Sequence, residues 1–257
     1  MTQHITDHLA QADPVMAALI AAVGAFDLQP EAELDAFQTL ARAIAHQQLN
    51  GTAANTILAR LIAGCGQGRF PSPQHVLDAT PASLRAAGFS LAKVAALRDL
   101  AEKTLARVVP EHEELLALSD EAIIERLTQV RGIGRWTVEM LLLFRLGRPD
   151  VLPVDDFGVR AGFRAAYGLR ALPHPKALAA FGERWRPYRS AAAWYLWRAV
   201  ELHRAGRLPP PGVRIRLPRV KKKKRSSGPT APARRPTKRV TRRVVRAQRS
   251  RRRRPRK

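Results

Sequence analysis

The chain of 257 residues has one cysteine, Cys65, and lacks any apolar run that approaches the length of a membrane span, roughly 18 residues. A single cysteine excludes an internal disulfide, a four-cysteine iron–sulfur site and a cysteine-based zinc finger. The first residues, MTQHITDHLAQADP, also lack the basic start and apolar segment of a secretory signal. We therefore expect a soluble, cytoplasmic protein without membrane contact, associated with the nucleoid if the source is bacterial.

Acidic residues are absent from the last part of the chain. Residues 206–257 contain no Asp or Glu but 23 Lys and Arg, so residues 1–205 keep 45 − 23 = 22 basic side chains against 21 acidic ones. Runs such as KKKKR and RSRRRRPRK repel themselves and contain few large apolar residues, which is typical of disorder. We predict a folded domain over residues 1–205 and a disordered basic tail over residues 206–257 that meets a polyanion, most often nucleic acid.

Strand-type alternation is also absent, whereas apolar residues recur at helical spacing. The predicted buried stripes are Phe37, Leu40, Ala41 and Ile44; Val94, Leu97, Ala101 and Leu105; and Ile123, Leu127 and Val130. Ser or Thr followed by Pro, at Ser72 and Thr80, marks two further helix starts, and Ser119 can cap another. The sequence therefore predicts an all-α fold, long enough for two lobes.

The stretch VRGIGRW, residues 130–136, joins two predicted helices through Gly132, Ile133 and Gly134. Glycine can take a positive φ and let the backbone approach a bulky ligand, while a buried Ile133 would anchor the turn. The unpaired amides at the start of the second helix then form a site for an anion such as a DNA phosphate. The alternative is an ordinary glycine-rich corner of a helical protein.

Four segments in combination resemble a known family: AIAHQQLNGTAA, GIGRWT, LPVDDFGVR and ERWRPYRSAAAWYLW. They resemble the helix-hairpin-helix DNA glycosylases, and most nearly the alkylation-repair branch, DNA-3-methyladenine glycosylase II. The resemblance spans roughly residues 37–197, leaves out the tail, and implies a two-lobed helical fold without the additional N-terminal β lobe of some bacterial members. It implies base-excision repair, in which a damaged nucleotide is flipped out of duplex DNA and its N-glycosidic bond is hydrolysed.

Asp156, the second Asp of VDDFGV, matches the catalytic position of that family. An alkylated purine such as 3-methyladenine is cationic and leaves without a dedicated general acid, so the reaction needs a carboxylate near the developing oxocarbenium sugar, and a water molecule. Asp155 and Asp156 both stand where a helix should begin, and Asp there is usually a cap. We expect Asp155 to cap the helix and Asp156 to enter its first turn. Whether Asp156 deprotonates water or acts only by its field stays open.

Trp136 stands where, by resemblance, the strand-cleaving members carry a lysine nucleophile. Because an indole forms no Schiff base, the resemblance implies a monofunctional hydrolase without lyase activity. The indole face also attracts a cationic base, and Trp197 matches the stacking tryptophan of the family. Tyr195 and Phe157 are further candidates for the base pocket. The ordinary alternative is that these aromatic residues belong to the core.

The resemblance also assigns the contacts with DNA. Gln48 or Leu49 matches the wedge that fills the gap left by the flipped nucleotide; otherwise Gln48 is a loop residue and Leu49 a core residue. A second corner, AAGFSLAKV, would present Lys93 to the backbone. The backbone carbonyls of Arg131 and Ile133 would hold a structural monovalent cation, and no other cofactor is expected. The hairpin residues expected to bind DNA are Gly132, Ile133, Gly134, Arg135 and Thr137.

The expected partner is double-stranded DNA containing damaged bases, bound by a monomer. Because residues 1–205 are nearly neutral, the tail should supply the sequence-independent attraction, and its deletion should lower affinity but spare single-turnover excision. The alternatives are a non-enzymatic DNA-binding or compacting protein and a glycosylase for another damaged base, such as a strand-cleaving enzyme for oxidised purines. The sequence does not choose among 3-methyladenine, 7-methylguanine, hypoxanthine and ethenoadenine.

Overall fold

The computed structural model describes residues 2–31, 35–213 and 215–218, and all regular structure within these ranges is helical. This confirms the predicted all-α class. The prediction of a disordered tail lies outside the described residues from 219 onward. None of the helices described is long and apolar enough to cross a membrane.

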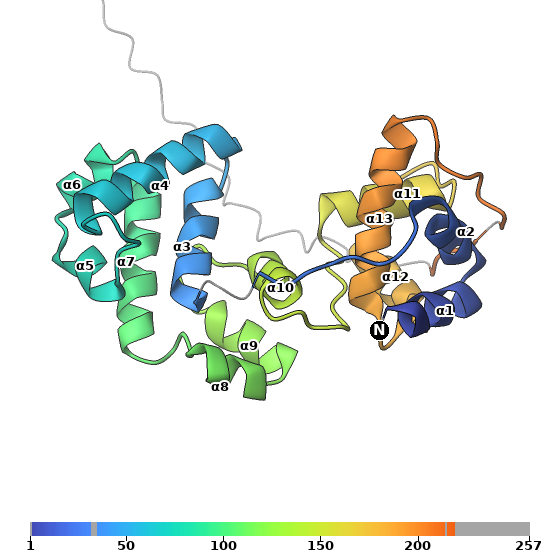
Figure 1. Ribbon diagram of the computed structural model, residues 1–257, viewed down its shortest axis with the longest axis horizontal. Helices are drawn as coiled ribbons and strands as arrows, with labels where there is room; N and C mark the ends of the chain where they lie inside the picture. Colours follow the sequence, from blue (N-terminus) through green and yellow to red (C-terminus); the bar gives the residue numbers. More distant parts are fainter. Residues whose placement is uncertain (1, 32–34, 214, 219–257) are drawn as a thin grey trace, which may run out of the picture. The chain divides into compact units, whose positions relative to one another are not determined.

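A first hydrophobic core, which includes Leu40, Leu97 and Leu142, lies among the helices drawn from blue to light green (Figure 1). These helices are α3 (Ala36–His46), α4 (Gly51–Cys65), α5 (Pro73–Asp78), α6 (Pro81–Ala86), α7 (Leu91–Leu105), α8 (His112–Ala117), α9 (Asp120–Leu127) and α10 (Arg135–Phe144). The three predicted stripes are buried here with one exception. Leu105 is 51% exposed, because it is the last residue of α7 and lies beyond the part that packs on the core.

Side-chain caps begin these helices as the sequence predicts. The side chains of Ser72, Thr80 and Ser119 each accept a hydrogen bond from the amide three residues further on. Asp35 and Ser90 make the same contact at the starts of α3 and α7. Each cap stabilises its helix by about 1 kcal/mol, which fixes where the helix starts.

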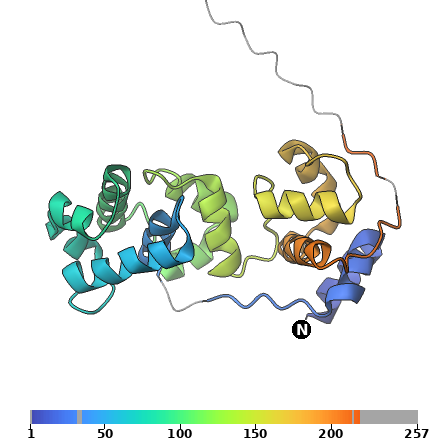
Figure 2. The same cartoon turned by 90° about the horizontal axis from the view of Figure 1, so that it is seen from above.

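A second core, which includes Leu19, Phe163 and Leu196, lies among the remaining helices. These are α1 (Gln3–Ala12), α2 (Pro14–Val23), α11 (Phe157–Ala166), α12 (Pro175–Gly182), a short 3-10 helix (Glu183–Trp185) and α13 (Arg189–Arg204). Figure 2 shows α11 and α13 side by side. Beyond α13, Leu208, Ile215 and Leu217 also pack against this core, so the chain contributes to it past residue 205.

Two glycines of α11 face α13. A Cβ atom built on Gly162 would lie 1.8 Å from the carbonyl oxygen of Leu196, so the two helix backbones touch at this point. Only glycine allows so close a crossing. This contact fixes the position of α13, including Trp197, relative to the start of α11.

A buried carboxylate joins the N-terminal helices to this core. Asp13 is 1% exposed and caps α2 by accepting the amide of Val15 at 3.0 Å. Its Oδ2 accepts the hydroxyl of Tyr167 at 2.6 Å and the indole Nε1 of Trp185 at 3.1 Å. Three hydrogen bonds thus offset the loss of water around this charge.

Candidate active site

The turn between α9 and α10 has the backbone that its glycines predict. Gly132 has a φ of +79°, Ile133 is 4% exposed, and Gly134 is the N-cap of α10, which has no side-chain cap. Within the described chain, nothing accepts a hydrogen bond from the amides of Gly134, Arg135 and Trp136. These amides and the positive end of the α10 dipole can bind an anion.

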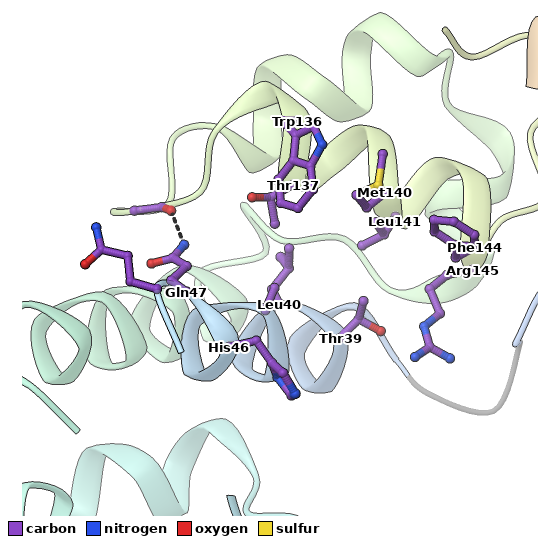
Figure 3. Close-up of a pocket in the computed structure, with 13 residues that line it drawn as sticks. Thr39, Leu40, His46, Gln47, Trp136, Thr137, Met140, Leu141, Phe144 and Arg145 are labelled. Carbon is purple, nitrogen blue, oxygen red and sulfur yellow. Dashed lines mark hydrogen bonds between the residues drawn. The ribbon is translucent and has the colours of Figure 1, made fainter. Parts of the chain in front are cut away.

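Two long-range hydrogen bonds hold the hairpin in place. Asp99 of α7 accepts the amide of Arg131 at 2.6 Å. Burial acts to raise the pKa of Asp99, but the Arg131 amide and the Lys103 ammonium outweigh burial and lower that pKa. Gln47, just after α3, donates its Nε2 to the carbonyl of Gly132 at 2.8 Å (Figure 3). Sequence reasoning missed Gln47, because its partner lies 85 positions away.

The turn after α3 presents both wedge candidates to solvent. Gln48 is exposed and has a φ of +58°, and Leu49 is 40% exposed, so Leu49 is not a core residue. A left-handed backbone at a non-glycine residue costs about 1 to 3 kcal/mol and persists where the surroundings enforce it. The structure therefore holds these two side chains outward at some cost.

Asp156 lies at the centre of the candidate site. It caps α11 itself, with Oδ1 accepting the amide of Val159 at 2.7 Å, which corrects the expectation that Asp155 is the cap. Asp155 is exposed and precedes the helix. The indole Nε1 of Trp197 donates to Oδ1 and that of Trp136 donates to Oδ2, each at 2.9 Å. Three donors fix the carboxylate and leave Oδ2 with an acceptor position for a further ligand.

Trp136 also borders an apolar cavity of about 640 Å³ between α3 and α10 (Figure 3). The indole is 48% exposed, so the prediction that it belongs to a pocket fits better than a place in the core. Met140 and Phe144 continue the same wall, and Leu40 and Ala43 of α3 line it as well. The four-residue spacing of Trp136, Met140 and Phe144 places them on one side of α10.

Trp197 lies behind that wall. Its ring stacks on Phe144 with centroids 5.6 Å apart and planes inclined by 24°. It packs partly buried against both cores and directs its N–H to Asp156. The structure therefore brings Asp156, Trp136 and Trp197 together, and the role of Trp197 in stacking on a base stays a prediction.

The two other aromatic candidates for the base pocket, Tyr195 and Phe157, differ in their exposure to solvent. Tyr195 is fully buried, its hydroxyl donates to the carbonyl of Gly24 at 2.9 Å, and burial raises its pKa to about 12. This corrects its assignment to the base pocket: Tyr195 is a core residue, because its side of α13 faces α2. Phe157 is the first residue of α11, next to Asp156, and is 69% exposed.

Arg135 begins α10, but its guanidinium is already bound. Nε pairs with Glu139 at 3.0 Å and Nη2 pairs with Glu121 at 3.2 Å. Glu139 is only 4% exposed, and burial raises its pKa to about 7 although Arg135 acts to lower it. The amide of Arg135 is open to an anion, and its side chain remains 53% exposed. Thr137 lines the cavity.

None of the lysines in the described ranges is hydrogen-bonded or ion-paired with Asp156. Lys93, expected to face DNA, donates its Nζ to the carbonyl of Ala45 at 2.8 Å, and burial lowers its pKa. It therefore ties α7 to the end of α3, which corrects that expectation. Lys103 pairs with Asp99, and neither of these lysines nor Lys176 lines the cavity.

Metal ligands were expected only from the hairpin backbone. In the described ranges, no group of three or more His, Cys, Asp or Glu could hold a metal ion. The carbonyls of Arg131 and Ile133 accept no hydrogen bond from the described residues, so their lone pairs suit a monovalent cation.

Known proteins resemble this chain in sequence. Residues 41–187 match the family described as "HhH-GPD superfamily base excision DNA repair protein". The curated DNA-3-methyladenine glycosylase 1 of Schizosaccharomyces pombe is 45% identical over 166 residues, which is 65% of this chain and 73% of that protein.

Solved structures show the same likeness. The 3-methyladenine DNA glycosylase of Schizosaccharomyces pombe in complex with abasic DNA has a TM-score of 0.68 and 40% identity, over 78% of this chain and 98% of that one. The DNA-3-methyladenine glycosidase of Bacillus halodurans has a TM-score of 0.72 and 31% identity, over 78% and 91% of the two chains.

Proposed function

Because this chain belongs to the HhH-GPD superfamily of base excision DNA repair proteins, in its alkylation-repair branch, we propose that it releases alkylated purines from duplex DNA. The reaction is hydrolysis of the N-glycosidic bond of a flipped nucleotide, as in relatives named for 3-methyladenine. The observation that carries the proposal is the Asp156 carboxylate, held by three N–H donors beside the half-exposed indole of Trp136.

Asp156 would stabilise the charge that develops on the sugar. As the bond from C1′ to the base breaks, the cationic purine leaves as a neutral base with the bonding electrons, and positive charge moves to the sugar. A fixed carboxylate lowers the energy of that state because it needs no reorganisation. Water then adds to C1′ and loses a proton, for which the open acceptor position on Oδ2 is available.

The enzyme would leave the DNA strand intact. Cleavage through a Schiff base needs an amine at the sugar carbon, and Trp136 has none. Its N–H is instead bound to Asp156, and no lysine of the described chain is hydrogen-bonded or ion-paired with Asp156. The product is then an abasic site.

The hairpin would bind a phosphate through the free amides of Gly134, Arg135 and Trp136. Gln48 and Leu49, both exposed, would fill the gap left by the flipped nucleotide. A monovalent cation held by the carbonyls of Arg131 and Ile133 would add positive charge next to that phosphate.

The flipped base would stack on the exposed indole of Trp136, with Phe157 close by. An electron-rich ring over a cationic purine contributes about 0.5 to 2 kcal/mol, depending on desolvation. An uncharged purine gains less from the same contact. The pocket therefore selects for the charge that alkylation places on the base.

The test is the release of free base from methylated duplex DNA by wild type, Asp156→Asn and Asp155→Asn. We expect Asp156→Asn to lower the single-turnover rate by roughly 100- to 1000-fold, as for the loss of one preorganised electrostatic contact. Asparagine still caps a helix, so the fold should persist. Asp155→Asn is the matched control and should retain the wild-type rate. Equal rates for all three proteins would contradict the proposal.

The same proteins address the alternatives. A protein that only binds or compacts DNA releases no base, and Asp156→Asn leaves its affinity unchanged. A strand-cleaving glycosylase forms a covalent adduct with DNA when borohydride reduces its Schiff base, and we expect no such adduct.

A further inference from the structure

Gly158 is the second residue of α11, two positions after the Asp156 cap and just before Val159. It does not have the left-handed backbone that requires glycine at Gly132. Glycine is among the least favourable residues inside a helix, so its presence here calls for another cause. The cause is that position 158 has no room for a side chain.

A Cβ atom at Gly158 would collide with the candidate site. It would lie 2.8 Å from Cδ1 and 3.0 Å from Nε1 of Trp197, and 3.0 Å from Oδ1 of Asp156. The indole edge of Trp197 thus occupies the place of the missing side chain. This is the edge that donates to Oδ1 at 2.9 Å.

Trp197 has little freedom to move aside. Its face stacks on Phe144, and the backbone of its neighbour Leu196 lies against Gly162. A methyl group at position 158 would therefore separate the indole edge of Trp197 from Oδ1 of Asp156, both of which lie within 3.0 Å of its carbon atom. That movement would break the hydrogen bond while leaving the helix crossing at Gly162 intact.

We propose that Gly158 is a positioning residue: the side chain it lacks admits the Trp197 indole to Asp156 and so fixes the orientation of the carboxylate. This inference rests on the proposed role of Asp156. A merely structural glycine would behave differently, because alanine is a better helix former and would leave the reaction unchanged.

The experiment compares wild type, Gly158→Ala and Gly64→Ala in single-turnover base release at saturating enzyme. Gly64 lies in the last turn of α4, and a Cβ there meets nothing within 4 Å. We expect Gly158→Ala to lower the rate by roughly 10- to 100-fold, as misplacements of about 1 Å can do, with little change in Km. Gly64→Ala should keep the wild-type rate.

A second readout does not depend on activity. The chain has four tryptophans, so four indole N–H signals are expected in the ¹⁵N–¹H spectrum, and Trp197→Ala identifies one of them. Gly158→Ala should shift the Trp197 signal by removing its carboxylate acceptor. In the Trp197→Ala background, which removes the two contacts with the indole, adding Gly158→Ala should change the rate less than about threefold because the two sites act through one contact.

The outcomes separate the two proposals. If wild type releases base and Gly158→Ala matches it with an unshifted indole signal, the inference is wrong and the proposed function stands. If wild type releases no base, the proposed function fails and the indole shift alone decides whether Gly158 sets the contact. If Gly158→Ala does not fold, recovery of folding in the double variant supports the inference, and its failure contradicts it.

Discussion

Two carboxylates of this chain have almost the same hydrogen bonds and opposite surroundings. Asp13 and Asp156 each cap a helix, and each accepts one backbone amide and two side-chain donors, of which at least one is an indole. Asp13 is 1% exposed and enclosed by the second core. Asp156 is partly exposed and accepts the indole N–H of Trp136, which lines the cavity.

The difference shows that the donor set alone does not identify a reactive carboxylate. At Asp13 all three donors belong to residues of the second core, so its hydrogen bonds contribute to stability. At Asp156 one donor, Trp136, is itself half exposed, and an acceptor position on Oδ2 remains open. Access to a ligand distinguishes the two sites.

The largest expected effects come from substituting each carboxylate in turn and measuring both the free energy of unfolding and the release of base. Asp13→Ala should lower the free energy of unfolding by roughly 3 kcal/mol, because Tyr167 and Trp185 lose a charged acceptor in the core. Base release per folded molecule should not change. Asp156→Asn should instead lower the rate of base release and change the free energy of unfolding by less than about 1 kcal/mol. Urea unfolding with single-turnover assays checks this, and loss of both properties in either variant would break the comparison.

Glu139 is a third carboxylate to compare, because it is buried like Asp13 but has only Arg135 as a side-chain donor. Its pKa is raised from 4.5 to about 7, so the folded state keeps a proton that the unfolded state releases between these values. The free energy of unfolding should therefore fall as pH rises from about 4.5 to 7, by up to about 3 kcal/mol at about 1.4 kcal/mol per unit.

Glu139→Gln should remove this dependence of the free energy of unfolding on pH. The measurement is urea unfolding at pH 5 and pH 7.5 of both proteins, with Glu121→Gln, an exposed partner of the same Arg135, as control. The same slope in wild type and Glu139→Gln would show that the Arg135 pairing keeps this carboxyl ionised.

A smaller effect should follow from removing one indole donor at each site. Trp185→Phe should lower the free energy of unfolding by about 1 to 3 kcal/mol, because a buried acceptor loses a partner. Trp136→Phe should cost less stability, since Trp136 is 48% exposed, and should slow excision about 10-fold through a less fixed Asp156 and a weaker π face. Equal stability losses would contradict the distinction.

The smallest effect on chemistry should come from truncation after Pro218, which removes 20 Lys and Arg without touching Leu208, Ile215 and Leu217 in the second core. The salt dependence of DNA binding should become shallower because fewer phosphates are neutralised. The single-turnover rate at saturating enzyme should stay within about twofold, since Asp156 is unaffected. A larger loss in rate would give the tail a part in catalysis.

Local features of this fold could be predicted because they depend on neighbours in sequence. The stripes of α3 and α9, the caps at Ser72 and Thr80 and the turn at Gly132 follow from spacing and backbone preference. Asp156, Trp136 and Trp197 could be selected because the motif around each of them matches one family.

Features that depend on distant partners could not be predicted. Asp13 meets Tyr167 and Trp185, which lie 154 and 172 positions away. Two adjacent aspartates are equally good caps, so the sequence could not decide between Asp155 and Asp156.

Tyr195 was misplaced for a related reason. Helix α13 packs on one side against α11 and on another against α2, so an aromatic residue on it can face either the site or the core. Periodicity gives no preference between these faces. The hydrogen bond from Tyr195 to the carbonyl of Gly24 decides it.

The hydrogen bond from Gln47 to Gly132 has a consequence for the search along DNA. It joins the turn that carries Gln48 and Leu49 to the hairpin, so the spacing between the proposed phosphate site and the two proposed wedge residues is already set in the free protein. The loop then needs little ordering when DNA arrives, and each trial insertion loses little conformational entropy. An enzyme built in this way can examine many base pairs rapidly, and the weak stacking of a damaged pair, more than any rearrangement of the protein, would decide where it stops.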